Sequence, residues 1–278
     1  MNRRRFLRTS AVAAPVLGAS AACAAPLTSG PAASRPAAPR RGADGWRIGR
    51  ALYENPLATE ADVAGWVAEG GVHVSFPTGR LRLENSDPVS DGREAHFVLW
   101  CPETFPADVA VSWSFLPVRE PGLAMVFLGA RGRGGEDLFD PALAPRDGVY
   151  PEYHSGDLDA LHASYFRRRR DTERQFQTVN LRKSHGFHLV AQGADPIPGV
   201  RDVVPDRTYR VQVVKAGPTL AFSIDGMELY RWTDDGTDLE GAPTGPPHTH
   251  PGKLGFRQMA PLMAEYADLA VHAVETDD

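Results

Sequence analysis

The chain has 278 residues, 42% of them hydrophobic, and a formal net charge of −5 at pH 7. Its two cysteines exclude a disulfide-stabilised scaffold, so stability has to come from an apolar core, which a chain of this length can bury. Without residues 1–25, which hold four arginines, 26 basic residues stand against 35 acidic ones. This negative balance argues against nucleic acid or an anionic membrane as the general partner.

The first 25 residues have the pattern of an export signal. A basic start, Arg3-Arg4-Arg5-Phe6-Leu7, precedes an apolar run that is too short to span a bilayer and a small-residue end. The arginines resemble the twin-arginine consensus, which predicts export in the folded state; an ordinary secretory leader is the alternative. Cys23 allows a further alternative, a lipid anchor at the cell surface. We therefore expect a secreted protein, either free or anchored.

Residues 26–46 are rich in Pro, Ala, Ser, Gly and Arg, and we expect a linker there. Residues 47–276 then form one domain. Hydrophobic alternation between turn residues predicts strands at 72–76, 80–84, 96–100, 109–116, 124–128, 161–166, 178–182, 187–192, 209–215, 219–224, 228–232, 253–257 and 266–274. Asp225-Gly226 is typical of a hairpin turn, residues 59–69 are expected to form a short helix, and 129–148 to form a long loop. The pattern predicts an all-β sandwich or jelly roll.

The stretch from residue 154 to residue 195 alternates polar and apolar side chains at strand spacing. This spacing predicts a polar face over an apolar one. The expected polar face carries His162, Ser164, Asn180, Arg182, His188 and Gln192. Such a density of proton-transfer and hydrogen-bonding groups is more than a solvated surface needs, and it indicates the floor of a ligand groove.

Four strings in the chain resemble the YesU-like proteins, a bacterial family with a domain of unknown function. They are SGDLDALHASYFRR, TVNLRKSHGFHLVAQGADPIP, FSIDG followed by RWTDDG, and GKLGFRQMAPLMAEYADLAVHAV. The resemblance covers roughly residues 51–274. It implies a concanavalin A-like or galectin-like jelly roll of two antiparallel sheets, with glycans lying across one concave sheet. The family often occurs beside pectin- and rhamnogalacturonan-degrading genes, which implies a polysaccharide or oligosaccharide ligand.

The polar side chains between residues 154 and 195 suit lyase-type cleavage of a uronate-containing glycan best. Elimination needs a group that neutralises the carboxylate, a base for the C5 proton and an acid for the leaving oxygen. We expect His188 or His185 as the base and Tyr165 as the acid, with His162 opposite. Arg182 offers a planar fork for a carboxylate. The other expected substrate contacts are Asn180, Lys183, Gln192, Arg167, Asp157, His154, Arg257, Gln258 and Glu265.

Two alternatives stay open. Glycoside hydrolysis needs two carboxyl groups that flank the bond, and its candidates are Glu152, Asp157, Asp159, Asp195 and Glu265. A non-catalytic lectin is the other alternative, because a groove with aromatic walls binds sugars without chemistry.

No cofactor or catalytic metal is expected. His248-Thr249-His250 and the string Asp234-Asp235-Gly236 with Asp238 have metal-binding residue types, and a structural calcium ion at the second string is the alternative to a turn. Cys101 lies in an apolar run and is expected to be a small buried hydrophobe.

Overall fold

The computed structural model describes residues 46–87, 96–168, 177–198 and 207–276. The expected export signal, Cys23 and nearly all of the linker lie outside these residues. Along the chain the elements are β1 (Trp46–Asn55), the 3-10 helix η1 (Glu60–Val63), β2 (Val67–Glu69), β3 (Val72–Ser75), β4 (Leu81–Asn85), β5 (Phe97–Phe105), β6 (Val109–Arg119), β7 (Gly122–Gly132), α1 (Tyr150–His154), β8 (Leu158–Arg168), β9 (Thr178–Lys183), β10 (His188–Ala194), β11 (Tyr209–Ala216), β12 (Thr219–Ile224), β13 (Met227–Thr233), β14 (Gly252–Met259) and β15 (Met263–Thr276).

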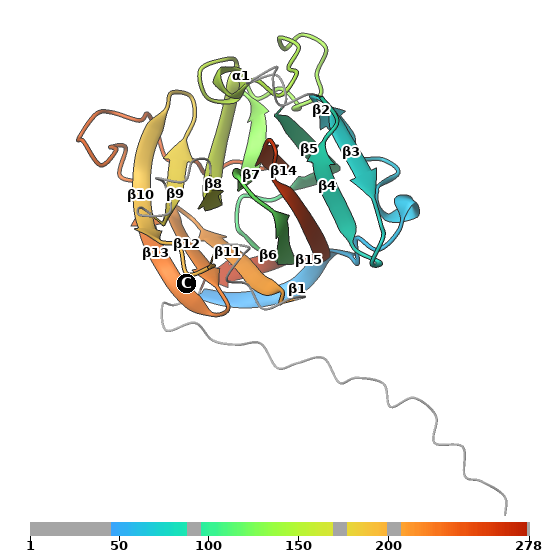
Figure 1. Ribbon diagram of the computed structural model, residues 1–278. Helices are drawn as coiled ribbons and strands as arrows, with labels where there is room; N and C mark the ends of the chain where they lie inside the picture. The colour runs from blue at the N-terminus through green and yellow to red at the C-terminus, as the bar shows by residue number, and fades with distance from the viewer. Residues whose placement is uncertain (1–45, 88–95, 169–176, 199–206, 277–278) are drawn as a thin grey trace, which may run out of the picture. The chain divides into compact units, whose positions relative to one another are not determined.

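The strands form two antiparallel sheets (Figure 1). The eight-stranded sheet has the order β13-β12-β11-β6-β15-β4-β3, and β1 pairs with β15. The seven-stranded sheet has the order β10-β9-β8-β7-β14-β5-β2. The expected all-β jelly-roll sandwich of the concanavalin A-like and galectin-like type is therefore confirmed.

The predicted strands are all present among the described residues. The Asp225-Gly226 hairpin turn is confirmed as well, with φ angles of 51° and 79°. The expected helix at 59–69 is wrong in its length, because only Glu60–Val63 is helical and Val67–Glu69 pairs with β5 as an edge strand. The strands β1 and β2 were missed. β2 is a three-residue edge strand and β1 pairs only with β15 among the described strands, so both are short or half-buried and show little alternation.

The main core lies between the sheets. Trp113 and Phe115 from β6 meet Tyr165 from β8, with ring centroids 5.9 and 5.0 Å apart. Cys101 is fully buried in this core, and burial raises the pKa of its thiol to about 11. The expectation of a buried hydrophobe at Cys101 is confirmed.

A second apolar cluster covers the outer face of the seven-stranded sheet. Its largest members are Trp100, Phe127 and Tyr153. Tyr153 belongs to α1, and its ring lies 5.6 Å from that of Phe127 in β7. The connection between β7 and β8 therefore folds over the outer face and packs on it. Since the core seals the inner face, the outer face is where this sheet can meet a ligand.

Candidate functional site

The strand register places the polar residues of the seven-stranded sheet in two rows across its outer face. One row runs through Val98, Arg257, Met125, Ser164, Asn180 and Gln192. The next row runs through Trp100, Gly255, Phe127, His162, Arg182 and Leu189. Apart from Leu189 of β10, the apolar side chains of both rows come from β5 and β7, and the polar ones come mostly from β8, β9 and β10. The predicted polar face is therefore present for His162, Ser164, Asn180, Arg182 and Gln192.

A bulge in β10 removes His188 from this face. The register shifts between Leu189 and Ala191, and both Val190 and Ala191 point into the inter-sheet core. Gln192 consequently pairs with Asn180 on the outer face, whereas His188 pairs with Lys183 on the other side of the sheet. The expectation that His188 and Gln192 share a face is wrong, because it assumed unbroken alternation.

Tyr165 is also displaced from the predicted site. Both Tyr165 and Phe166 belong to the inter-sheet core, and Phe166 has a φ of 48°, so two consecutive residues of β8 point inward. The Tyr165 hydroxyl accepts a hydrogen bond from Nε1 of Trp113 at 3.1 Å, and its side chain is fully buried. A proton-donor role for Tyr165 is therefore wrong: no ligand on the outer face can reach it.

A tyrosine that the sequence reasoning missed stands over the outer face instead. The Tyr150 hydroxyl lies 2.7 Å from Nδ1 of His162, and Nε2 of His162 lies 3.1 Å from Oγ of Ser184. Ser184 donates its only hydroxyl proton to the carbonyl of Tyr153. The proton between His162 and Ser184 therefore belongs to Nε2 of His162, which leaves Nδ1 as an acceptor and Tyr150 as the donor. Burial raises the pKa of Tyr150 and lowers that of His162, so both groups are neutral near pH 7.

Three arginines surround this pair. Arg257 is fully buried beneath α1, with its guanidinium carbon 4.9 Å from the Tyr150 ring centroid, and Nη1 donates to the carbonyl of Gly148 at 2.7 Å. Its Nε and Nη2 atoms are buried without a partner among the described residues. Arg182 and Arg167 also act on Tyr150, where their charges oppose the rise of its pKa. The outer face is therefore strongly positive at this point.

His154 and Phe187 complete the site. The His154 ring lies 4.8 Å from that of Tyr150 and 4.6 Å from that of Phe187. The guanidinium of Arg182 stacks on the Phe187 ring at 3.6 Å, and Phe187 is 49% exposed. Burial, followed by the charges of Arg182 and Arg257, lowers the pKa of His154 to about 4. His154 is therefore a neutral imidazole at physiological pH, held beside cations.

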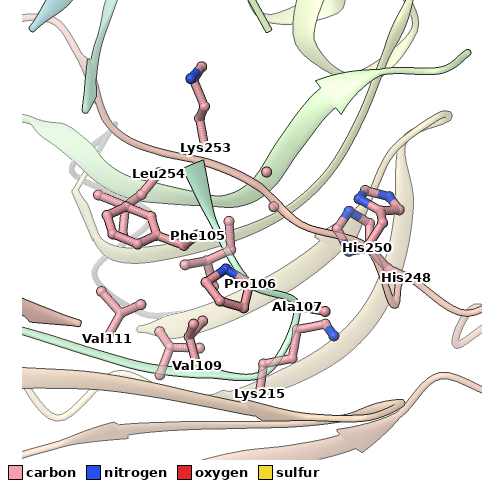
Figure 2. Close-up of a pocket in the computed structure, with 14 residues that line it drawn as sticks. Phe105, Pro106, Ala107, Val109, Val111, Lys215, His248, His250, Lys253 and Leu254 are labelled. Carbon is pink, nitrogen blue, oxygen red and sulfur yellow. The ribbon is translucent and has the colours of Figure 1, made fainter. Parts of the chain in front are cut away.

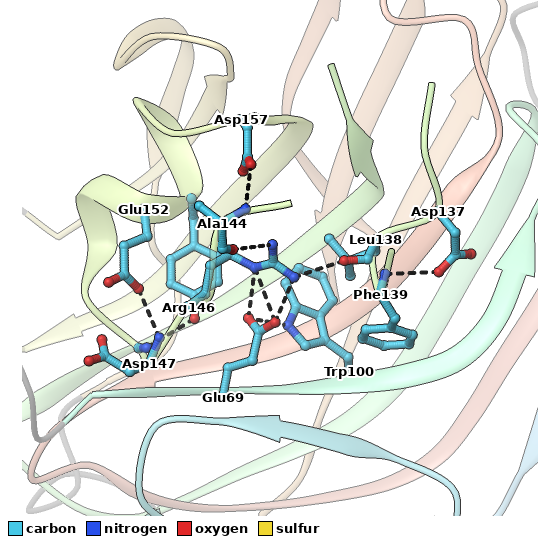
Figure 3. Close-up of polar contacts among 12 residues, drawn as sticks. Glu69, Trp100, Asp137, Leu138, Phe139, Ala144, Arg146, Asp147, Glu152 and Asp157 are labelled. Carbon is cyan, nitrogen blue, oxygen red and sulfur yellow. Dashed lines mark hydrogen bonds and ion pairs between the residues drawn. The ribbon is translucent and has the colours of Figure 1, made fainter. Parts of the chain in front are cut away.

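A buried ion pair anchors the connection that carries Tyr150 and His154. Figure 3 shows Arg146 against Glu69, with Nη2 donating to Oε1 at 2.7 Å. Glu69 also accepts from Nε1 of Trp100 at 2.8 Å, and Arg146 donates to the carbonyl of Leu138. The contacts join β2, β5 and the β7–β8 connection.

Among the described residues, four of the five carboxylates proposed for hydrolysis have structural partners, Asp159 being the exception. Asp157 accepts from the backbone N–H of Ala144, and Glu152 from that of Asp147 (Figure 3). Asp195 is buried and accepts from the N–H of Ile197. Glu265 is buried in the eight-stranded sheet, where it pairs with Arg82, so its expected substrate contact is wrong. The two rows of the outer face contain no carboxylate at all.

Two further predicted contacts are buried as well. Gln258 is fully buried, and its side chain is hydrogen-bonded to the Tyr266 hydroxyl in the core, so its expected contact with substrate is wrong. Lys183 is 2% exposed and pairs with Asp234 at 2.8 Å. By contrast, Arg167 is half-buried and donates to Oγ1 of Thr178, and Gln192 is exposed and donates to Asn180.

His185 and His188 line a separate pocket of about 780 Å³ at one end of the sandwich, which we call the end pocket. It lies where β7 ends, β8 begins and β9 meets β10, and the β13–β14 connection forms its far wall. Nδ1 of His188 contacts Oδ2 of Asp238 at 3.0 Å. His185 is exposed and lies 3.3 Å from the carbonyl of Ser155. Asp159 also lines this pocket.

Within the described ranges, no group of three or more His, Cys, Asp and Glu side chains is arranged to hold a metal ion. In the proposed calcium string, Asp234 pairs with Lys183, Asp235 accepts from Thr237, and Asp238 contacts His188. A calcium ion there stays a prediction. No helix in the described part of the chain is long and apolar enough to cross a membrane.

The residues that the sequence did not predict, Tyr150 and Phe187, carried weak local signals. Tyr150 lies in a Gly- and Pro-rich connection, as does His154, which was an expected substrate contact, and the folding of this connection over β7 and β8 brings both to the polar face. Phe187 was assigned to a strand, although it belongs to the turn before β10. An aromatic residue with half its surface exposed is a signal that appears only with the structure.

Comparisons with known proteins agree with this fold. The chain matches the family described as domain of unknown function DUF1961 over residues 50–271. It is 52% identical over 227 residues to the uncharacterized protein YesU of Bacillus subtilis, covering 82% of this chain and 97% of YesU. A crystal structure from Bacillus subtilis, of a protein of unknown function with a galectin-like fold, matches with a TM-score of 0.75 and 49% identity, covering 84% of this chain and 100% of that one.

A more distant structural match shares the fold alone. The endo-β-1,3-glucanase from Pyrococcus furiosus has a TM-score of 0.53 and 12% identity, covering 84% of this chain and 96% of that one. Sequence and structure together give one assignment: the chain belongs to the YesU-like family that carries the domain of unknown function DUF1961.

Proposed function

We propose that the outer face of the seven-stranded sheet binds a uronate-containing polysaccharide or oligosaccharide and cleaves it by β-elimination. One observation carries the proposal: a neutral histidine and a protonated tyrosine lie together beside three arginines, on a face whose two rows contain no carboxylate. Such a face attracts an acidic sugar and can move a proton to and from it. The expected export of the chain would bring the protein to polysaccharides outside the cytoplasm.

Arg182 is the group suited to the substrate carboxylate. Its guanidinium is half-buried, is fixed by its bond to the carbonyl of Phe187 at 2.6 Å, and is stacked on the Phe187 ring. A fixed planar fork binds a carboxylate with little loss of side-chain freedom. Arg257 is too deeply buried to touch the ligand, but its charge strengthens the positive field beneath the site. Neutralising the carboxylate makes the C5 proton more acidic.

His154 is suited to accept that proton. Its Nδ1 contacts Oγ of Ser155 at 2.7 Å, and its Nε2 has no hydrogen bond within the described residues. Burial, together with the charges of Arg182 and Arg257, keeps His154 neutral in the free protein. A bound carboxylate offsets these charges, so the pKa of His154 rises when substrate is present, which makes it a stronger base.

Tyr150 is suited to protonate the leaving oxygen. Its raised pKa keeps the phenol protonated, and His162 holds the hydroxyl in place until it turns to the substrate. In the proposed step the C5 proton passes to His154, the C4–O4 bond breaks, a C4–C5 double bond forms, and O4 takes the phenol proton of Tyr150. Exchange with solvent then removes the proton from the His154 imidazole and returns a proton to the Tyr150 phenolate.

The proposal is tested by incubating the protein with pectic polysaccharides and oligouronides, and with the same polymers after reduction of their carboxyl groups. Elimination yields ultraviolet absorbance from the unsaturated product together with new reducing ends, and carboxyl reduction abolishes both. Arg182→Gln is expected to remove activity, whereas Arg207→Gln, at an exposed ion pair with Asp225, leaves it unchanged.

Other outcomes would assign the site differently. Reducing ends without absorbance would identify hydrolysis instead, and would direct attention to Glu152, whose pKa is raised by burial. Binding without either signal would identify a lectin.

A further inference from the structure

The outer face of the seven-stranded sheet is accessible over only part of its width. The side chains of the two rows on β5, β14 and β7 are at most 3% exposed, namely Val98, Trp100, Arg257, Met125 and Phe127. Among the described positions of the rows, half-buried or exposed side chains occur only on β9 and β10: Arg182, Leu189 and Gln192. Since neighbouring strands lie about 4.8 Å apart, the accessible part of the face is narrow, roughly two strands wide.

The β7–β8 connection covers the rest of the face and is firmly held there. The ring of Tyr153 in α1 lies 5.6 Å from that of Phe127 and 6.3 Å from that of Trp100. The buried pair of Arg146 and Glu69 fixes the same connection to β2. A ligand would have to break these contacts to reach β7, β14 or β5, so the site is closed on this side.

The turn between β9 and β10 closes a second side of the site. Three consecutive residues of this turn contact backbone carbonyls at the end of α1, namely Ser184, His185 and Gly186. Oγ of Ser184 donates to the carbonyl of Tyr153 at 3.0 Å. These contacts separate the outer face from the end pocket, which Ser184 and His185 line.

The space behind this turn narrows into the sandwich. His248 and His250 line both the end pocket and an interior cavity of about 20 Å³ (Figure 2). A cavity of that volume holds a water molecule and is too small for a sugar ring. The accessible part of the outer face continues in the opposite direction, toward half-buried Thr178 and exposed Gln192.

The residues assigned as acid and base belong to the closed corner between these two sides. The rings of Tyr150, His154 and Phe187 lie 4.6–5.6 Å from one another, and Arg182 stacks on Phe187. A sugar unit that contacts both Tyr150 and His154 therefore lies at the limit of the accessible surface. A glycan can extend from that unit toward Thr178, but a chain that continued the other way would meet the packed rings.

We propose that the site receives the end of an acidic glycan chain, and that cleavage releases its terminal unit or pair of units. This inference rests on the proposed function, because it places the same acid and base against the chain end. A site that cleaves within a long chain needs room for sugar units on both sides of the bond. Here the buried contacts of α1 and of the β9–β10 turn close two sides next to Tyr150 and His154.

The test measures the binding of hexagalacturonide with both ends free, with a bulky fluorophore at either end, and with a fluorophore at both ends. Blocking both ends should weaken binding at least about tenfold, because one fluorophore then has to displace the packed rings. One of the two singly blocked forms should bind as the free hexamer does. Arg182→Gln should weaken binding of the free hexamer, whereas Arg207→Gln, at an exposed ion pair, should not.

The products give a second readout. With polygalacturonate, unsaturated or saturated mono- and disaccharides are expected from the first turnovers, while the viscosity of the polymer falls little. Equal binding of the free and doubly blocked hexamers, or early products of intermediate length, would overturn the chain-end assignment and leave elimination in place. If no oligouronide binds, or if binding survives Arg182→Gln, the proposed function itself fails and the chain-end assignment fails with it. Binding without cleavage would remove the elimination step alone, since the blocked hexamers still decide whether a chain end is required.

Discussion

The Tyr150 hydroxyl donates to Nδ1 of His162 across 2.7 Å, and this contact joins the β7–β8 connection to the polar face of β8. His162 is 1% exposed and stacks on Phe127 at 5.2 Å, so it cannot turn away from Tyr150. In the free protein the phenol proton thus points at a buried ring, and its transfer to a leaving oxygen requires the hydroxyl to turn from His162 to the substrate.

Tyr150→Phe tests this arrangement. If Tyr150 protonates the leaving oxygen, kcat/KM for elimination should fall by about 10²–10⁴-fold. The variant should also lose about 1–3 kcal/mol of unfolding free energy, because Nδ1 of His162 loses its donor. Kinetics and urea denaturation measure the two effects.

Tyr230→Phe is the matched control, since the buried Tyr230 hydroxyl has no partner among the described residues, and Tyr230→Phe should retain both activity and stability. Full activity in Tyr150→Phe would remove its role.

His154 predicts a specific pH dependence. Its pKa is about 4 in the folded protein and near its ordinary value of about 6.5 when unfolded. Protonation therefore favours the unfolded chain, and this contribution to stability is fully present above pH ~6.5 and is lost as the pH falls toward ~4. His154→Gln should flatten the fall in unfolding free energy between these pH values, as urea titrations would measure. It should also lower kcat about 10²–10⁴-fold at neutral pH. An unchanged pH slope would contradict the assignment of the low pKa to His154.

The fold followed from the sequence because alternation and turn residues act locally. Asp225-Gly226 and the strand of Trp113 and Phe115 are determined by a few neighbours. The site was harder to predict, since a bulge between Leu189 and Ala191 shifts the alternation by one residue and moves His188 to the other side. Tyr165 directly follows Ser164 of the outer face, so ordinary alternation alone turns it into the core.

Long-range contacts explain why Tyr150 was not predicted. The β7–β8 connection carries Tyr150 and His154 to the polar face, where Tyr153 packs on Phe127 and Arg146 pairs with Glu69, a residue 77 positions earlier in the chain. No spacing within a single segment carries that information. Arg257 was predicted as a substrate contact, and the register does place it on the outer face, but α1 covers it.

Arg146→Ala should loosen the β7–β8 connection without unfolding the sandwich. The Arg146 and Glu69 side chains are 6% and 10% exposed, and removing the guanidinium leaves a nearly buried carboxylate, which costs about 3–5 kcal/mol. Hydrogen exchange should increase mainly at residues 133–157, and kcat/KM should fall because Tyr150 and His154 lose their positions. Arg119→Ala, which removes a more exposed partner of Glu84, is the control and should change neither. Uniformly faster exchange across both sheets would instead show that the ion pair supports the whole fold.

Lys183→Met should be among the most destabilising single changes that leave the outer face intact. Lys183 and Asp234 are 2% and 4% exposed, and Nζ of Lys183 also donates to the carbonyl of Pro246 at 2.7 Å. Removing the ammonium leaves the Asp234 carboxylate buried without a cation, with only the N–H groups of His248 and Gly236 as remaining donors among the described residues, so we expect a loss of about 3–5 kcal/mol in urea denaturation. Asp234→Asn combined with Lys183→Met should recover part of this loss, because no unpaired charge is then buried.

Arg207→Gln is the control, because the side chains of its ion pair with Asp225 are 54% and 39% exposed, and it should change the free energy of unfolding by less than about 1 kcal/mol. Equal losses in Lys183→Met and Arg207→Gln would show that the buried pair contributes no more than a surface one.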